Sequence, residues 1–226
     1  MELSGYPLTL VSAGWVTIQL AMVSLLVGLC LALLFAAGEL SKWKLIAWPT
    51  TLIVTMLRGL PELLVVLFIF FGTTHAIFLL TGQFVEIDPF WSGVIALALI
   101  FAAYASQSIR GALKAVPSGQ SEAAYALGFS KTSAFFRYVL PQAVRHALPG
   151  LTNQWLVLLK DTALVSLIGV TDLMKQAQLI SSATHESFTW YATVAGIYLV
   201  ITLISQKLIK RISVKFEPPG QQKANA

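Results

Sequence analysis

The sequence predicts an all-α bundle of helices embedded in a membrane. Hydrophobic residues make up 57% of the 226 residues and charged residues only 11%, whereas a soluble domain carries about 25% charged residues. The mean hydropathy is +0.77. Several apolar runs also reach the length of about 20 residues that a helix needs to cross a bilayer. The chain length suits one bundle, and we expect a single transmembrane domain over residues 1–214.

Five apolar runs predict five transmembrane helices. They cover approximately residues 15–37, 48–72, 90–109, 147–170 and 188–206. The second and fourth runs are less purely apolar than the others. The tail 215–226 is polar and contains Pro and Gly, which predicts disorder.

The distribution of basic residues predicts the orientation of the bundle. Twelve of the fifteen Lys and Arg residues lie in the loops after the first and third runs and in the C-terminal tail, whereas only Lys175 lies on the other side. The positive-inside rule then places the N-terminus outside and the C-terminus inside. We therefore expect a multi-pass protein of a bacterial inner membrane, surrounded by lipid, with the loop 110–146 in the cytoplasm. The same placement accounts for the net charge of +5 without a nucleic-acid partner.

The cytoplasmic loop contains a polar segment that predicts an elbow of two helices. Residues 118–127 form the first helix, Gly128 can take the left-handed conformation that closes it, and Ser130 caps the second helix. Pro141 ends or kinks the second helix before the fourth run. An ordered elbow of this kind suits docking to a soluble partner. A solvated loop that merely connects two spans is the alternative.

A motif in this elbow resembles the EAA motif of permease subunits of ABC importers. Its residues are Glu122, Ala123, Ala124, Gly128, Leu140 and Pro141. Ala123 and Ala124 are small and would let another surface approach closely. Tyr138 stands where the family usually has an aliphatic residue, and it keeps a bulky contact. Further segments, such as 57–61 and 160–164, resemble the polar amino-acid uptake branch, and most of all its arginine importers, so that the resemblance covers roughly residues 10–210.

The resemblance implies a type I ABC-importer permease fold and a set of partners. These are two ATPase subunits, a second permease subunit of related sequence that forms a heterodimer with this chain, and a periplasmic amino-acid-binding protein. The elbow helix would dock on the ATPase and couple ATP hydrolysis to alternating access. The expected substrate is L-arginine, with histidine, lysine or glutamine as alternatives.

The chain itself is expected to be a translocating subunit rather than an enzyme. It lacks the P-loop spacing G-x-x-x-x-G-K-[ST], so ATP and Mg²⁺ would bind to the partner ATPase. His75, His146 and His185 lack metal-ligand spacing. We therefore predict no catalytic residue, no cofactor and no metal site in this chain.

Charged residues inside the apolar runs are candidates for the substrate path, because such residues usually face a cavity or a partner. Arg58 and Glu62 are four residues apart and could form a structural ion pair that stabilises a kink at Pro61; lining the substrate path is the alternative. Lys160 and Asp161 are adjacent and point about 100° apart on a helix.

The fourth run offers hydrogen-bonding groups beside these charges. A break near Asp161 and Thr162 would let both Lys160 and Asp161 face a cavity, and Asn153 lies on the same run. Asp161 and Glu62 are the candidates to contact a cationic side chain. Arg58 or Lys160 would then contact the substrate carboxylate.

Gln107 in the third run is a further candidate for the substrate path. It stands where many relatives carry an acidic residue, so this subunit would contact the substrate differently or leave that contact to its partner.

Two other functional classes remain open from the residues alone. One is a stand-alone secondary transporter or channel that oligomerises, and the elbow argues against it because such a carrier needs no ATPase-docking helix. The other is a purely structural membrane subunit, and the intramembrane charges argue against it because idle charges at that depth are costly.

Overall fold

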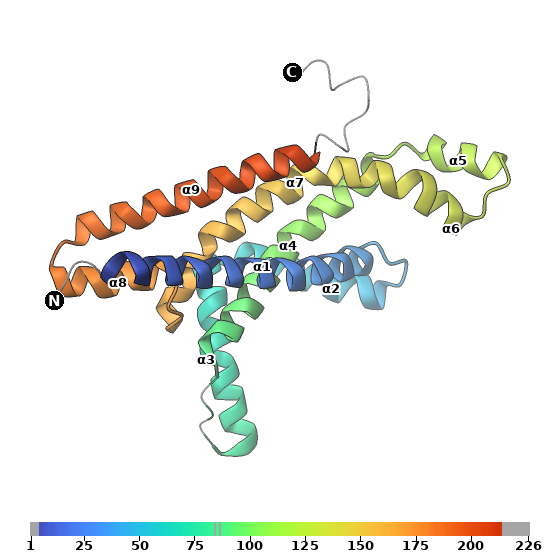
Figure 1. Cartoon of the computed structure of the whole chain (residues 1–226). Coiled ribbons are helices and arrows are strands. Elements are labelled where there is room, and N and C mark those ends of the chain that lie inside the picture. Colours follow the sequence, from blue (N-terminus) through green and yellow to red (C-terminus); the bar gives the residue numbers. More distant parts are fainter. Residues whose placement is uncertain (1–4, 84, 86, 214–226) are drawn as a thin grey trace.

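The computed structural model describes residues 5–83, 85 and 87–213, and confirms an all-helical chain (Figure 1). The predicted disordered tail 215–226 lies outside the described residues. The α-helices are α1 Tyr6–Glu39, α2 Lys44–Gly59, α3 Glu62–Thr81, α4 Pro89–Ala115, α5 Ser118–Ala126, α6 Lys131–Ala134, α7 Leu140–Asp161, α8 Leu173–Thr184 and α9 Ser187–Ser213. A π-helix η2, Phe135–Val139, precedes α7, and a 3₁₀-helix η3, Thr162–Ile168, follows it.

Four helices among these residues are long and apolar enough to cross a membrane. They are Tyr6–Glu39, Glu62–Thr81, Pro89–Ala115 and Ser187–Arg211. The first, third and fifth predicted runs lie within α1, α4 and α9. The other two runs differ from the prediction.

The prediction of one helix over residues 48–72 is wrong, because two helices meet inside that run. α2 ends at Gly59 and α3 begins at Glu62. Between them Leu60 and Pro61 are extended, with ψ of 145° and 133°. The ring of Pro61 disfavours the helical conformation of the preceding residue, Leu60. Pro61 also has no N–H that could donate the next hydrogen bond of the helix. The run therefore breaks in the middle, next to its two charged residues.

The fourth run, residues 147–170, also differs from a single α-helix. The α-helix begins earlier, at Leu140, ends at Asp161, and continues as the tighter 3₁₀-helix η3 up to Ile168. Gly169, with φ of 102°, then turns the chain. The sequence analysis considered a break in the helix near Asp161 and Thr162. At this point the structure has a change from α-helix to 3₁₀-helix.

Pro141 neither ends nor interrupts the second elbow helix. Lys131–Asp161 is helical throughout, because the turn before Pro141 widens into η2, where the Leu140 N–H bonds to the Phe135 carbonyl. A wider turn moves the preceding carbonyls away from the proline ring, which in a regular α-helix clashes with the carbonyl four residues earlier.

The centre of the bundle is α4, which packs along α1 through small residues. A Cβ atom added to Gly28 of α1 would lie 2.7 Å from Phe101 Cδ1 and 3.1 Å from the Ala98 carbonyl oxygen on α4. Ala32 is fully buried in the same core. On the far side of α4 a Cβ on Gly150 of α7 would lie 2.6 Å from Ser108 Oγ. Small residues thus let the backbones approach closely on both sides of α4.

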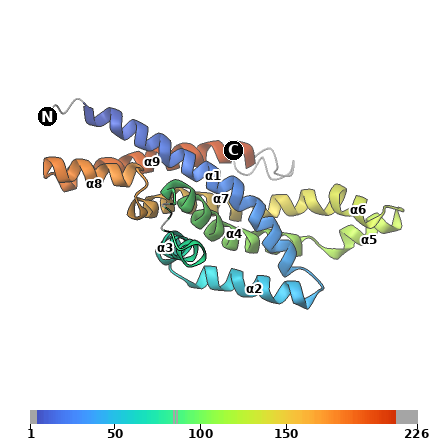
Figure 2. The same ribbon diagram turned by 90° about the horizontal axis from the view of Figure 1, so that it is seen from below.

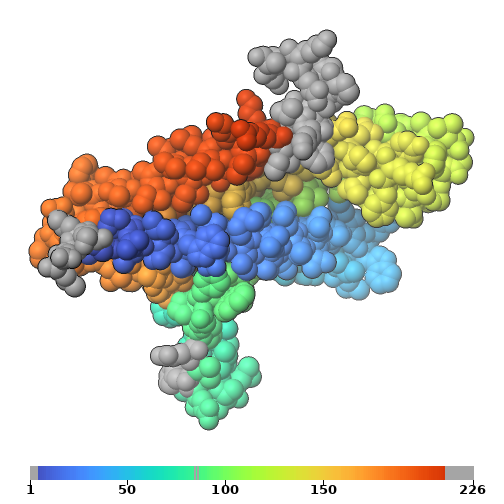
Figure 3. Space-filling view, viewed as in Figure 1, coloured from blue at the N-terminus to red at the C-terminus, as the bar shows by residue number. Residues whose placement is uncertain are grey.

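The elbow and the N-terminal end of α1 lie at opposite ends of the molecule. In Figure 1, α5 and α6 project at the right, where α4 ends and the helix leading into α7 begins, whereas α8 and the N-terminal end of α1 lie at the left. Figure 2 shows the same separation from below. The space-filling view shows that the elbow projects beyond the packed part of the bundle (Figure 3).

The sequence analysis missed α8, which occupies the loop after the fourth run. The Asp172 side chain caps this helix by accepting a hydrogen bond from the Lys175 N–H at 2.9 Å. Its buried residues Leu173, Ala177 and Ile180 pack against α1 and α9 in a second apolar core. An Asp followed by this i, i+4, i+7 spacing is the signal that could have predicted it.

We expect the Gly28→Val variant to be less stable than the wild type, because the added side chain must displace Phe101 or the Ala98 backbone. Overpacking of this kind costs about 1–3 kcal/mol. Thermal unfolding in mild detergent measures the effect. Gly196→Val on α9 is the matched control, since a Cβ there meets nothing within 4 Å. Equal unfolding temperatures for the two variants would contradict the close α1–α4 contact.

Candidate functional site

A cluster of charged and polar groups forms at the break between α2 and α3. The Tyr104 hydroxyl on α4 donates to the Arg58 carbonyl at 3.3 Å and to Glu62 Oε1 at 3.4 Å. The Arg58 guanidinium lies over the Tyr104 ring, 5.6 Å from its centroid. Asp161 lies within electrostatic range of Glu62 and of Lys160. We call Arg58, Glu62, Tyr104, Lys160 and Asp161 the charged cluster.

The expected ion pair between Arg58 and Glu62 is not present among the described residues. The extended Leu60 and Pro61 place these two residues on different helices, so the four-residue spacing of a continuous helix does not apply. Tyr104 instead contacts both of them. The sequence analysis did not single out Tyr104 as a site residue.

The charged cluster lies on an exposed face of the chain. Arg58 and Lys160 are exposed, whereas Glu62, Tyr104 and Asp161 are half-buried. Large apolar side chains stay exposed along α2 and α3 on both sides of the cluster, namely Trp48, Met56, Leu64 and Phe68. Charged groups among apolar residues of membrane helices usually face a cavity or a partner.

Three predicted path residues lie outside the charged cluster. Gln107 is one turn from Tyr104, but its amide donates to Glu39 Oε2 at 2.9 Å. Asn153 is exposed on α7, two turns before Asp161. Thr162 is fully buried, and its hydroxyl donates to the Leu159 carbonyl at 2.7 Å.

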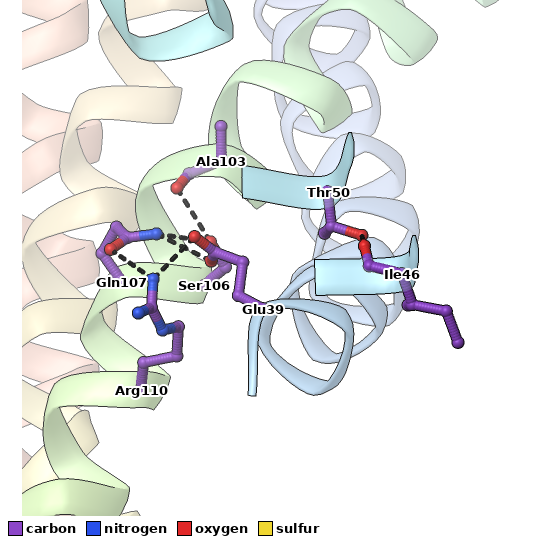
Figure 4. Close-up of polar contacts among 7 residues, drawn as sticks. All are labelled: Glu39, Ile46, Thr50, Ala103, Ser106, Gln107 and Arg110. Atoms are coloured by element: carbon purple, nitrogen blue, oxygen red, sulfur yellow. Dashed lines mark hydrogen bonds and ion pairs between the residues drawn. The ribbon is translucent and has the colours of Figure 1, made fainter. Parts of the chain in front are cut away.

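A buried ion pair joins α1 to α4 near the end that leads into the elbow. Arg110 Nη1 lies 2.6 Å from Glu39 Oε1 and 3.2 Å from Gln107 Oε1 (Figure 4). The Glu39 side chain is only 2% exposed. Gln107 is therefore engaged with this pair, which accounts for an amide at its position. Sequence reasoning assigned Arg110 only to the cytoplasmic charge count and did not single out Glu39.

A second buried network joins four elements at the other end of α7. The Tyr198 hydroxyl on α9 donates to Asp172 Oδ2 at 3.3 Å and lies 3.3 Å from the Thr162 hydroxyl. The N–H of Leu173 donates to Thr17 Oγ1 on α1 at 3.1 Å. Thr17, Thr162 and Asp172 are each 0% exposed. We call Thr17, Thr162, Asp172 and Tyr198 the Asp172 network.

Burial raises the pKa of the Asp172 carboxyl above its ordinary value, and hydrogen bonds from the Lys175 and Met174 N–H groups and from Tyr198 lower it in part. Buried polar groups need such partners because a group left unpaired is costly.

The elbow is held together by its own contacts. Gly128 has a φ of 84°, as the corner requires, and the Ser133 N–H donates to Ser130 Oγ. The Phe129 and Tyr138 rings meet edge to face, with centroids 5.2 Å apart. Tyr138 thus fills the bulky contact expected at its position.

The EAA residues differ in exposure. Glu122 and Ala123 are exposed, but Ala124 is only 3% exposed. The expectation that both alanines face an approaching surface is wrong for Ala124, which lies on the inner side of the elbow. Leu127 and Phe136 are 76% and 60% exposed. The elbow thus keeps large apolar side chains exposed as well as Glu122.

A comparison with protein families matches residues 25–215 to the binding-protein-dependent transport system inner membrane component. The chain is 54% identical over 223 residues to the arginine ABC transporter permease protein ArtQ of Escherichia coli K12, covering 91% of this chain and 94% of that protein. It is 55% identical over 205 residues to ArtQ of Haemophilus influenzae, covering 91% of this chain and 92% of that protein.

A solved structure has the same fold. The crystal structure of an amino acid ABC transporter with histidines contains a chain that matches with a TM-score of 0.84 and 33% identity, covering 94% of this chain and 96% of that one. The likeness therefore extends over nearly the whole helical bundle.

Proposed function

The chain belongs to the binding-protein-dependent transport system inner membrane components, and we propose that it is the membrane-spanning permease subunit of an ATP-driven importer of L-arginine. The observation that carries the proposal is the charged cluster on an exposed face of membrane helices. Glu62 and Asp161 there supply carboxylates that suit a guanidinium. The similarity to ArtQ supports arginine as the substrate.

The bundle crosses the membrane five times in this proposal, by α1, the broken α2–α3 pair, α4, α7 and α9. An odd number of crossings puts the termini on opposite sides. The basic residues assign the C-terminus and the elbow to the cytoplasm. The position of the elbow opposite the N-terminal end of α1 supports this orientation (Figure 1).

Energy for transport comes from partner ATPase subunits that bind ATP and Mg²⁺, since this chain has no P-loop. The outer side of the elbow docks on the ATPase through Glu122, Ala123 and the exposed Leu127. The two ends of the elbow continue into α4 and α7, which carry Tyr104 and Asp161 of the charged cluster. Movement of the elbow therefore moves both sides of the cluster and alternates access to it.

A second permease subunit of related sequence covers the exposed face of α2 and α3, so the charged cluster lines a cavity between two chains. A periplasmic amino-acid-binding protein delivers the substrate from the other side. Arg58 or Lys160 binds the substrate carboxylate.

Histidine is the second candidate substrate, and a specific observation favours it. The solved structure that matches over most of the chain is described as an amino acid transporter with histidines. Histidine presents the same carboxylate and ammonium groups as arginine but a smaller imidazole side chain, which is mostly neutral at pH 7.

Purification of the chain with a C-terminal tag in mild detergent, followed by mass spectrometry, tests the importer class. A stoichiometric P-loop ATPase and a second permease chain should co-purify. Scrambling Glu122-Ala123-Ala124 should release the ATPase. Recovery of the chain alone as a stable oligomer would refute the proposal and point to a stand-alone carrier.

We expect Gly128→Trp to assemble but to uncouple ATP hydrolysis from uptake. An L-residue in the left-handed conformation costs about 1–2 kcal/mol, and the bulky ring changes the docking corner. Gly128→Asn is the matched control, because Asn tolerates this conformation with a small side chain. Uptake per ATP hydrolysed in proteoliposomes measures the effect. Normal coupling in an assembled Gly128→Trp complex would contradict the role of the corner.

We expect Asp161→Asn and Glu62→Gln each to raise the KM of arginine uptake roughly tenfold to a hundredfold, because each removes a charged acceptor for the guanidinium. Kinetics of labelled arginine uptake into proteoliposomes measure this. Glu186→Gln on the predicted periplasmic side is the control for a general loss of negative charge. If both cluster variants keep the wild-type KM, these carboxylates do not bind the substrate.

A further inference from the structure

The Asp172 network reaches the charged cluster through a single peptide bond. Asp161 is the last residue of α7, and Thr162 is the first residue of η3. Thr162 is fully buried, and its hydroxyl lies 3.3 Å from that of Tyr198. Asp161 is only half-buried and lies in range of Glu62. Thr162 thus belongs to the Asp172 network, and its neighbour Asp161 lies near the charged cluster.

The change of helix type at this point makes the direction of Asp161 sensitive to Thr162. Successive residues turn by about 100° in an α-helix and by about 120° in a 3₁₀-helix. The Thr162 N–H still bonds to the Leu158 carbonyl four residues earlier, as in an α-helix, and η3 begins at this residue. Moving the transition by one residue would therefore rotate the Asp161 carboxylate relative to the cluster.

Thr162 is linked to three other elements, directly through Tyr198 and indirectly through Asp172 and Leu173. The Tyr198 hydroxyl on α9 donates to Asp172, which caps α8 through the Lys175 N–H, and lies against the Thr162 hydroxyl. The Leu173 N–H, one residue further, is anchored on Thr17 of α1. Because Thr17, Thr162 and Asp172 are fully buried, their polar groups depend on partners within this network and on neighbouring backbone groups.

The Asp172 carboxylate already serves as the cap of α8, and its backbone partner cannot be replaced by an apolar group. Its Oδ2 atom also accepts from Tyr198, a contact that capping alone does not require. The Asp172 network therefore also fixes the conformation of the backbone turn that carries Asp161.

We propose that Tyr198 and Asp172 are positioning residues for substrate binding, which act through Thr162 to aim the Asp161 carboxylate into the charged cluster. This inference rests on the proposed function, in which Asp161 contacts the cationic group of the substrate. Neither residue touches the substrate itself.

The test uses the reconstituted complex in proteoliposomes, with labelled arginine as the probe. Tyr198→Phe removes the hydroxyl and keeps the ring, and should raise the KM for arginine about fivefold to tenfold while kcat changes less than twofold. Thr162→Val should raise KM in the same way, and Thr162→Ser, which keeps a hydroxyl, should raise it less. Tyr191→Phe, exposed on the same helix, is the control and should behave as wild type.

A double variant separates positioning from a merely structural role. In Tyr198→Phe/Asp161→Asn, the KM should equal that of Asp161→Asn alone, because the network then has no carboxylate to aim. If the rise in KM of the double variant equals the product of the rises in the two single variants, the proposal is overturned. An unchanged KM in both Tyr198→Phe and Thr162→Val would also overturn it, as would a fall in kcat and in yield of the complex with KM unchanged.

The experiment distinguishes failure of this inference from failure of the proposed function. If the wild-type complex takes up no amino acid, or Asp161→Asn leaves KM unchanged, the function proposed for Asp161 fails, and the positioning proposal with it. If Asp161→Asn raises KM but Tyr198→Phe and Thr162→Val do not, only the positioning proposal fails.

Discussion

The close approach of α1 and α4 is the contact on which the rest of this structure depends. Between helices in lipid the hydrophobic effect supplies little attraction, so packing of small residues must hold them together. Gly28 meets α4 with no room for a side chain, and Gly150 on α7 meets Ser108 in the same way. α4 is therefore fixed on two sides. Its one polar face, with Tyr104 and Gln107, can then present these groups at defined positions.

The polar groups among these helices fall into two kinds. The Glu39–Arg110 pair and the Asp172 network are closed within the chain, so they fix helices against one another at the two ends of the bundle. The charged cluster is open, since Arg58 and Lys160 are exposed. In the closed groups each charged side chain has a partner within the chain, although Arg110 Nε is buried without a hydrogen-bond partner among the described residues. An open group of charges at membrane depth needs a cavity or a second chain. This contrast, rather than charge alone, marks the functional face.

The sequence predicted the helical class, the apolar runs within α1, α4 and α9, and the elbow with its Gly128 corner, because each depends on local composition or on one residue of special geometry. It did not predict the break at Leu60–Pro61 from hydropathy, since both sides of the break are apolar. Tyr104 and Tyr198 were missed as site residues because their roles depend on partners 42 and 26 residues away in the chain. The four-residue spacing of Arg58 and Glu62 suggested an ion pair, but this spacing brings two side chains together only in an unbroken helix.

The helical continuity from Lys131 to Asp161 has a geometric consequence. A helical stretch of this length is about 46 Å long at 1.5 Å per residue, and it contains no loop, although the π-helix η2 and Pro149 lie within it. A movement of the elbow therefore reaches the carboxylate at the other end through helix alone. A single inserted residue would rotate one end by about 100° relative to the other. The number of residues in this stretch thus matters for function as much as the residues at its two ends.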